Sequence, residues 1–173
     1  MTYRKRENVK GHSDPDPELI LEKIRYFCSY RERSEKETEL KLKSMLVPYV
    51  KVKGILNQLR EEGFISDERY ARAFVRGKWR VNQWGKIRIT FELRSRNIPD
   101  KLISTALEEI GTDAYREVLD KVIRKKAAGL RPKQKEKNNT RKILNVRDKL
   151  FNFALGKGYE SDLIREILDE LKI

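Results

Sequence analysis

An internal repeat runs along this chain of 173 residues and restricts the folds open to it. When the chain is aligned with itself without gaps so that Ile89 falls on Leu150, other apolar positions coincide as well: Ile98 falls on Tyr159, Leu102 on Leu163 and Leu107 on Leu168. A second gap-free alignment, in the other direction, places Val50 on Ile98, Ile55 on Ile103 and Leu59 on Leu107. Repeats of this length bury little surface alone, and they stack into a quasi-linear core.

Each repeat contains three segments whose apolar residues recur at the 3/4 spacing of a helix, as in Ile20, Ile24 and Phe27. The sequence therefore predicts an all-α fold, an elongated array of three tandem three-helix repeats. We expect a disordered basic tail at 1–16, then repeats at 17–66, 67–111 and 112–173, the last of which carries a basic loop at 129–142.

Polar capping residues mark where several helices should begin. Asp16 precedes Pro17, Ser34 stands three residues before Glu37 in a capping box, and Asp67 is placed to cap a fourth helix. With the apolar spacing, these signals predict a first, an eighth and a ninth helix at about 17–33, 144–156 and 161–171.

The segment 86–97 fits two patterns. Its apolar residues alternate strictly, as in a strand, but Ile87 with Phe91 and Ile89 with Leu93 also stand four residues apart, as on a helix. We expect a helix, because a lone strand would have no partner for its backbone. Asn97, which tolerates the left-handed conformation, should end it.

The net charge of +13 is concentrated in two stretches. Residues 76–96 hold seven cations against one acid, and residues 121–149 hold twelve against two, so the rest of the chain is slightly acidic. Uniform solubilisation would not concentrate positive charge in this way, and the clustering favours a polyanionic partner, nucleic acid first.

We expect partner or DNA contacts at some of the cations of these stretches and at one aromatic residue among them. Trp79 and Trp84 both lie among cations, which suits a phosphate backbone with exposed bases, although either ring could instead pack between repeats. The candidate contact residues are Arg76, Lys78, Arg80, Trp84, Lys86, Arg88, Arg94, Arg96, Arg131, Lys133, Lys135, Lys137, Arg141 and Lys142.

No pattern of catalytic chemistry stands out. The chain lacks a phosphate-binding glycine loop, a zinc-protease motif and a nucleophile elbow, and Cys28 and His12 are each the only residue of their type. We therefore expect a protein that is not an enzyme and needs no cofactor or metal. The sequence shows no secretory signal and no apolar run long enough to cross a membrane, so we expect it to work in the cytoplasm.

Two runs of the sequence resemble the RecX family of bacterial regulatory proteins. They are GFISDERYARAFVR, which begins at Gly63, and WGKIRITFELRSRNI, which begins at Trp84. The matching positions are Gly63, Phe64, Ile65, Asp67, Arg69, Tyr70, Ala71, Phe74, Trp84, Gly85, Lys86, Ile89, Glu92, Leu93, Arg96 and Ile98. The match is dense in the middle repeat, and looser spacing extends it to about residues 17–172.

The resemblance implies a modular three-helix-repeat fold. It also implies binding to the RecA filament on single-stranded DNA and modulation, most simply inhibition, of its ATPase and strand exchange, and so a role in DNA repair, recombination and the SOS response. We expect a monomer whose DNA contacts do not depend on sequence. The chain departs from the family at Asn97, where glycine is usual, at Ser66, where an acid is common, and in the long basic segment 129–142.

Two other functions fit the same residues. A non-specific binder of single- or double-stranded DNA would need no RecA, and it would bind bare and RecA-coated DNA equally well. An interaction scaffold whose charge only maintains solubility would show little dependence on salt.

Overall fold

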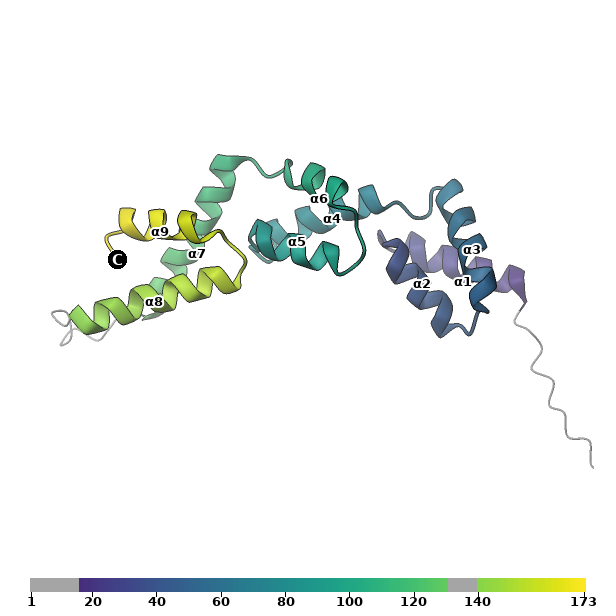
Figure 1. Cartoon of the computed structure of the whole chain (residues 1–173), viewed down its shortest axis with the longest axis horizontal. Helices are drawn as coiled ribbons and strands as arrows, with labels where there is room; N and C mark the ends of the chain where they lie inside the picture. The colour runs from purple at the N-terminus through teal and green to yellow at the C-terminus, as the bar shows by residue number, and fades with distance from the viewer. Residues whose placement is uncertain (1–15, 131–139) are drawn as a thin grey trace, which may run out of the picture.

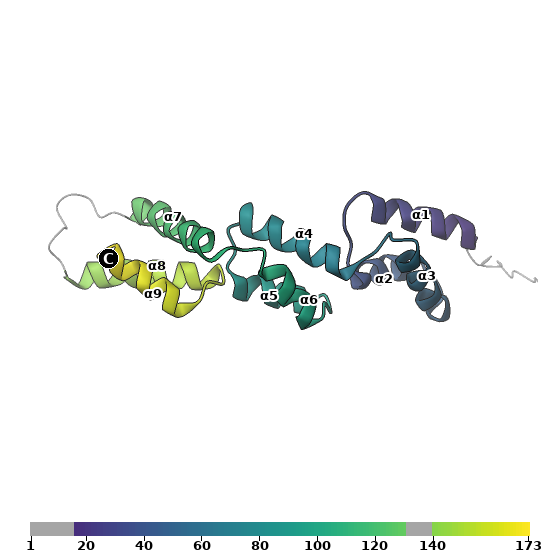
Figure 2. The ribbon, with the colours of Figure 1, turned by 90° about the horizontal axis from the view of Figure 1, so that it is seen from above.

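The computed structural model describes residues 16–130 and 140–173, and these residues form nine α-helices and no strand. Figures 1 and 2 show the helices in an elongated array of three units that follow one another along the long axis. The fold is thus the expected all-α array of tandem three-helix repeats.

Three consecutive helices make up each unit. The first unit contains α1 (Pro17–Ser29), α2 (Glu35–Ser44) and α3 (Tyr49–Glu61). The middle unit contains α4 (Asp67–Arg80), α5 (Lys86–Arg94) and α6 (Asp100–Leu107). The last unit contains α7 (Thr112–Leu130), α8 (Thr140–Gly156) and α9 (Ser161–Glu170).

Most of the expected helix starts occur where the capping residues predict them. The Asp16 carboxylate accepts a hydrogen bond from the amide of Glu18 at 3.0 Å, and Ser34 Oγ accepts one from the amide of Glu37 at 3.1 Å. These bonds satisfy amides that a helix leaves unpaired in its first turn.

The start of α4 differs from the expectation. Ser66, not Asp67, is the N-cap, and its Oγ accepts from the amide of Arg69 at 3.3 Å. Asp67 is the first helical residue, and its carboxylate accepts a hydrogen bond from the amide of Glu35 in the first unit at 3.1 Å. A tertiary contact therefore uses the side chain that the local rule assigned to capping.

The ambiguous segment is the helix α5. Ile89 and Leu93 are fully buried, whereas Ile87 and Phe91 are 53% and 70% exposed. Residues two apart therefore lie on different faces, as in a helix, whereas a strand would place all four side chains on one face. Asn97 follows with φ of +60°, the left-handed conformation expected at this helix end.

Two hydrophobic clusters hold the described residues together. One belongs to the first unit and is built on Ile24, Leu42 and Leu59. The other is continuous through the middle and last units and includes Leu93 and Leu150. The array therefore contains one small body and one larger body with a shared core.

Several helix limits differ from the expected ones. The first helix ends at Ser29, four residues early. Because α7 continues through Leu130 and α8 begins at Thr140, residues 129–130 and 140–142 of the expected basic loop are helical. The expected disordered tail lies outside the described residues except for Asp16, as do residues 131–139, and the limits of the three repeats stay predictions. Among the described residues, no helix is both long enough and apolar enough to cross a membrane.

Candidate interaction surface

The seven candidate cations of residues 76–96 all lie in the middle unit, but three of them are paired with acids of the same chain. Arg94 binds Asp100 at 2.7 Å, and Arg96 binds Glu92 at 2.8 Å. Arg76 shares Glu109 with a neighbouring arginine and lies 3.3 Å from it. Because these acids offset the positive charge locally, the three arginines attract an outside polyanion less than the sequence suggests.

Two other cations lie over the ring of Trp84. The Arg88 guanidinium is 4.0 Å from the ring centroid, and Lys78 Nζ is 4.9 Å from it. Among the described residues, neither cation has an acidic partner. An aromatic face attracts a cation without neutralising its charge, so both remain available to an anion.

The remaining two cations of this stretch differ in surroundings. Lys86 Nζ lies 4.9 Å from the ring centroid of Tyr115, at the contact between the middle and last units. Arg80 is exposed at the end of α4, with its guanidinium 5.9 Å from the ring centroid of Trp79. Like Lys78 and Arg88, they form no ion pair in the described part of the chain.

Both tryptophans pack against the core that the middle and last units share. Trp84 also meets Phe74 edge-on, with ring centroids 6.5 Å apart, and Trp79 Nε1 is buried without a hydrogen-bond partner. Both rings therefore pack against the protein core, and the contact with Phe74 lies within the middle unit. A base-stacking role for Trp84 stays a prediction.

The structure adds cations from the last unit that sequence reasoning missed. Lys126 and Lys157 lie over the ring of Phe153, at 5.0 and 5.7 Å from its centroid. Lys157 also donates to the carbonyl of Asn82 in the middle unit at 3.1 Å, which brings it beside Arg88. The self-alignment that places Ile89 on Leu150 also places Arg96 on Lys157, a signal that could have drawn attention to this lysine.

The pKa of Lys157 reflects burial first and the neighbouring positive charges second. Burial lowers the pKa of its ammonium group below 10.5, and the positive charges of Arg88 and Lys125 lower it further. We call Lys78, Arg88, Lys126 and Lys157 the cationic junction surface. Like charges held together in this way favour an incoming anion, because it relieves their repulsion.

The candidate residues of the basic segment are only partly described. Arg131, Lys133, Lys135 and Lys137 lie outside the described residues, and Arg141 and Lys142 lie in the first turn of α8. A partner contact at any of these six residues stays a prediction. Within residues 16–130 and 140–173, no group of three or more His, Cys, Asp or Glu side chains could hold a metal ion.

Comparison with known proteins points to one family. Residues 66–107 match the family model described as the second three-helix domain of RecX. The regulatory protein RecX of Prosthecochloris aestuarii is 29% identical over 159 residues, which cover 92% of this chain and 97% of that protein. The regulatory protein RecX of Clostridium acetobutylicum is 28% identical over 141 residues, or 80% of this chain, and this chain spans only 62% of its length.

The fold has a solved counterpart. The crystal structure of RecX from Lactobacillus salivarius superposes with a TM-score of 0.74 at 25% identity, covering 90% of this chain and 96% of that one. The agreement extends over all three units, whereas the family model matches only the middle one.

Proposed function

The chain belongs to the RecX family of regulatory proteins, and we propose on that basis that it binds the RecA filament on single-stranded DNA and inhibits its ATPase and strand-exchange activity. Through this action it regulates DNA repair and recombination. The observation that carries the proposal is the continuous core of the middle and last units, which presents the cationic junction surface on a rigid support.

A rigid, elongated protein suits a filament groove because it can contact several protomers in a row. We propose that the array bridges successive RecA protomers and resists the rearrangements that ATP turnover and strand exchange require. Its positive side chains meet acidic filament surface, exposed DNA phosphate or both. Binding should then weaken steeply as salt rises, since such contacts are screened or release counterions.

The first experiment measures RecA's DNA-dependent ATP hydrolysis while the protein is titrated in. Single-stranded DNA is kept in large excess, so that competition for DNA cannot lower the rate. Inhibition below one copy per RecA protomer supports the proposal and favours capping or cooperative bridging. An unchanged rate at stoichiometric excess contradicts it.

Charge reversals then test where the filament is contacted. Arg88→Glu removes a cation that has no acidic partner in the described part of the chain, so it should weaken filament binding about tenfold or more. Arg94→Glu is the matched control, because it changes the net charge by the same amount at an arginine that is already paired with Asp100, and it should weaken binding less. If Arg88→Glu and Arg96→Glu both bind the filament like the unaltered protein, the middle unit is not the contact surface.

Three further properties belong to this proposal. The protein acts by binding and not by catalysis, it acts as a monomer, and it acts in the cytoplasm, where RecA filaments form.

The second candidate is a non-specific nucleic-acid-binding protein without a RecA partner. The cationic junction surface favours it as well, since cations beside aromatic rings suit single strands of any sequence. The two candidates differ in one ratio of affinities. Tighter binding to RecA-coated than to bare single-stranded DNA supports the filament regulator, and equal binding supports the second candidate.

A further inference from the structure

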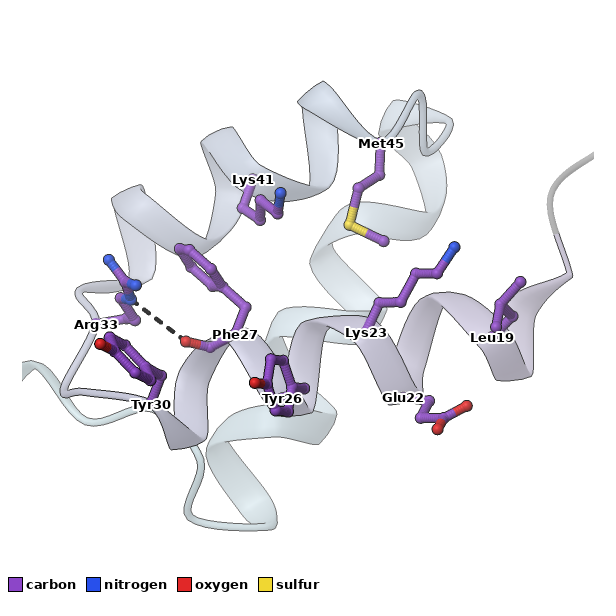
Figure 3. A pocket seen from close by; sticks show the side chains of 9 residues that line it. All are labelled: Leu19, Glu22, Lys23, Tyr26, Phe27, Tyr30, Arg33, Lys41 and Met45. Carbon is purple, nitrogen blue, oxygen red and sulfur yellow. Dashed lines mark hydrogen bonds between the residues drawn. The ribbon is translucent and has the colours of Figure 1, made fainter.

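A groove opens in the first unit, far from the cationic junction surface. It lies between α1 and α2 and has a volume of about 600 Å³, and its apolar lining includes Leu19, Phe27 and Met45 (Figure 3). Neither the repeat pattern nor the two basic stretches drew attention to this part of the chain.

Two tyrosines stand at the rim of the groove, Tyr26 on α1 and Tyr30 at the C-cap that follows it. Tyr26 and Tyr30 are 76% and 80% exposed, and their spacing of four residues puts them on one face of the helix (Figure 3). A single exposed aromatic ring is common on protein surfaces, but two neighbouring rings beside an apolar groove are a feature of binding sites.

Cations surround the same groove. Arg33 lies over the Phe27 ring, 3.9 Å from its centroid, and Lys41 lies 5.7 Å from it. Lys23 stands on the α1 side (Figure 3). In the part of the chain that the structure describes, none of these three cations forms an ion pair, although nearby Arg25 and Arg31 both do.

The lining residues contain a single acid, Glu22, and it has no ion-pair partner among the described residues. The groove therefore combines a net positive charge, an apolar lining and two exposed aromatic rings. This combination matches the chemistry of an unpaired nucleic-acid strand, which offers phosphates and flat apolar bases together.

We propose that this groove binds single-stranded nucleic acid, with bases stacked on Tyr26 and Tyr30 and phosphates held by Lys23, Arg33 and Lys41. An acidic peptide could satisfy the cations, but it would not supply flat faces for two exposed rings. A duplex keeps its bases stacked inside and cannot offer them. The inference rests on the proposed function in one respect: it adds a strand-binding site, in a different unit, to a protein proposed to act on coated single strands.

Removing the two rings tests the proposal on the full chain. A fluorescein-labelled dT12 strand is titrated with the unaltered protein and with the double variant Tyr26→Ala, Tyr30→Ala, and binding is followed by fluorescence anisotropy. The dissociation constant should rise about tenfold in the double variant. Both side chains are exposed, so the fold should persist, and unchanged far-ultraviolet circular dichroism verifies this.

Two controls separate stacking from other effects of the substitutions. Tyr49 of α3 is 78% exposed and has Lys43 Nζ 5.8 Å from its ring centroid, but it does not line the groove, so Tyr49→Ala should bind dT12 like the unaltered protein. The double variant Tyr26→Phe, Tyr30→Phe keeps both rings and should also bind normally.

A strand without bases provides the sharpest comparison. An abasic strand of the same length keeps the phosphates, so the unaltered protein should bind it about as weakly as the double alanine variant binds dT12. Equal binding of dT12 by the double alanine variant and the unaltered protein overturns the proposal. If the double alanine variant binds dT12 normally but no longer binds RecA-coated DNA, the groove holds a protein segment instead.

The same set of proteins separates this inference from the proposed function. The bare dT12 titration contains no RecA, and the ATPase titration reports on the filament. Normal ring-dependent binding of dT12 with no effect on RecA would remove the proposed function and leave the groove assignment standing.

Discussion

The two junctions between the three units are held together by different kinds of contact. Between the middle and last units, backbone meets backbone: the amide of Gly85 donates to the carbonyl of Lys157 at 2.8 Å, and the amide of Ile87 donates to that of Gly158 at 3.0 Å. Tyr115 completes the contact, since its hydroxyl accepts from the amide of Lys86 and donates to Glu160, both at 2.8 Å. Beneath these bonds the hydrophobic core is continuous.

Between the first and middle units the contacts are mainly polar. Asp67 accepts from the amide of Glu35, Arg69 pairs with Glu32 at 2.9 Å, and Lys36 reaches the carbonyl of Ser95. No buried cluster of the described residues crosses this junction, and a cleft of about 450 Å³ opens beside it.

This difference teaches which part of the array can act as a rigid body. Ion pairs at a surface contribute little and are screened by salt, whereas a shared core and buried backbone bonds are lost only on unfolding. We therefore expect the middle and last units to move as one piece, with the first unit attached more loosely. The cationic junction surface lies on the rigid body of the middle and last units. The groove with Tyr26 and Tyr30 at its rim lies on the first unit.

The largest expected effect comes from filling the tight backbone contact. A Cβ atom added at Gly85 would collide with the backbone carbonyl of Gly158, which no flexible side chain can relieve. Gly85→Ala should therefore lower the free energy of unfolding of the body formed by the middle and last units by about 3 kcal/mol. Urea denaturation followed by tryptophan fluorescence measures it, because both tryptophans pack on this core.

Two helix glycines supply matched controls. Gly77 in α4 and Gly54 in α3 have open space where a Cβ would stand, so Gly77→Ala and Gly54→Ala should each add about 0.5–1 kcal/mol through the better helix propensity of alanine. If Gly85→Ala does not lower the free energy of unfolding relative to these two variants, the backbones at Gly85 and Gly158 do not approach each other in solution.

Loss of one hydroxyl should have the next largest effect. Tyr115→Phe leaves the part-buried amide of Lys86 without the acceptor it has in the structure, and it also removes the bond to Glu160. The expected cost is about 1–3 kcal/mol in the free energy of unfolding. Tyr26→Phe, at an exposed position with no such bond, should change it by less than about 0.5 kcal/mol.

Alkaline pH should weaken the same junction. Burial raises the pKa of Tyr115 and of Tyr159 well above the ordinary value of 10, and Glu160 adds to both shifts. The neutral phenols therefore contribute stability that is fully present below about pH 10 and is lost as pH rises through the raised values. Unfolding midpoints measured from pH 8 to 11 should fall above pH 10, and less steeply in Tyr115→Phe. Parallel curves for the two proteins would contradict this account.

Local sequence rules were enough for the helices and for most of their starts. The 3/4 spacing and the capping residues depend on neighbours within one turn, so Ser34 and Asn97 could be assigned from the sequence. Asp67 could not, because its role depends on the amide of Glu35 in another unit. The correct prediction of a helix for α5 came from the lack of a partner for a lone strand and not from the pattern of the segment itself.

The candidate surface was harder to predict because charge in a sequence does not reveal pairing. Arg76 looks free until the fold brings Glu109, from beyond the end of α6, to lie beside it. Lys157 looks ordinary until the junction brings it next to Arg88. The groove beside Tyr26 and Tyr30 could not be predicted for a related reason. Tyr26 fits the polar face of an amphipathic helix, and only the structure shows which residues lie beside it.

The smallest effect on stability should come from a substitution at the polar junction between the first and middle units. Its main result should be greater motion of the first unit relative to the middle one. Asp67→Ala removes the acceptor for the amide of Glu35 and should cost about 1 kcal/mol. Spin labels at Lys53→Cys and Lys101→Cys span this junction, and labels at Lys101→Cys and Lys121→Cys span the other. Cys28 should stay unlabelled, because it is buried and burial raises its thiol pKa.

Electron–electron distance measurements on these pairs compare the two junctions directly. The distribution across the first junction should already be the broader one, and Asp67→Ala should broaden it further without changing the other. Asp67→Asn is the control, since it keeps the acceptor oxygen, and burial already raises the pKa of the Asp67 carboxyl above 3.8 and disfavours its charge. Equally narrow distributions across both junctions would mean that polar contacts alone hold the first unit as firmly as a shared core holds the last.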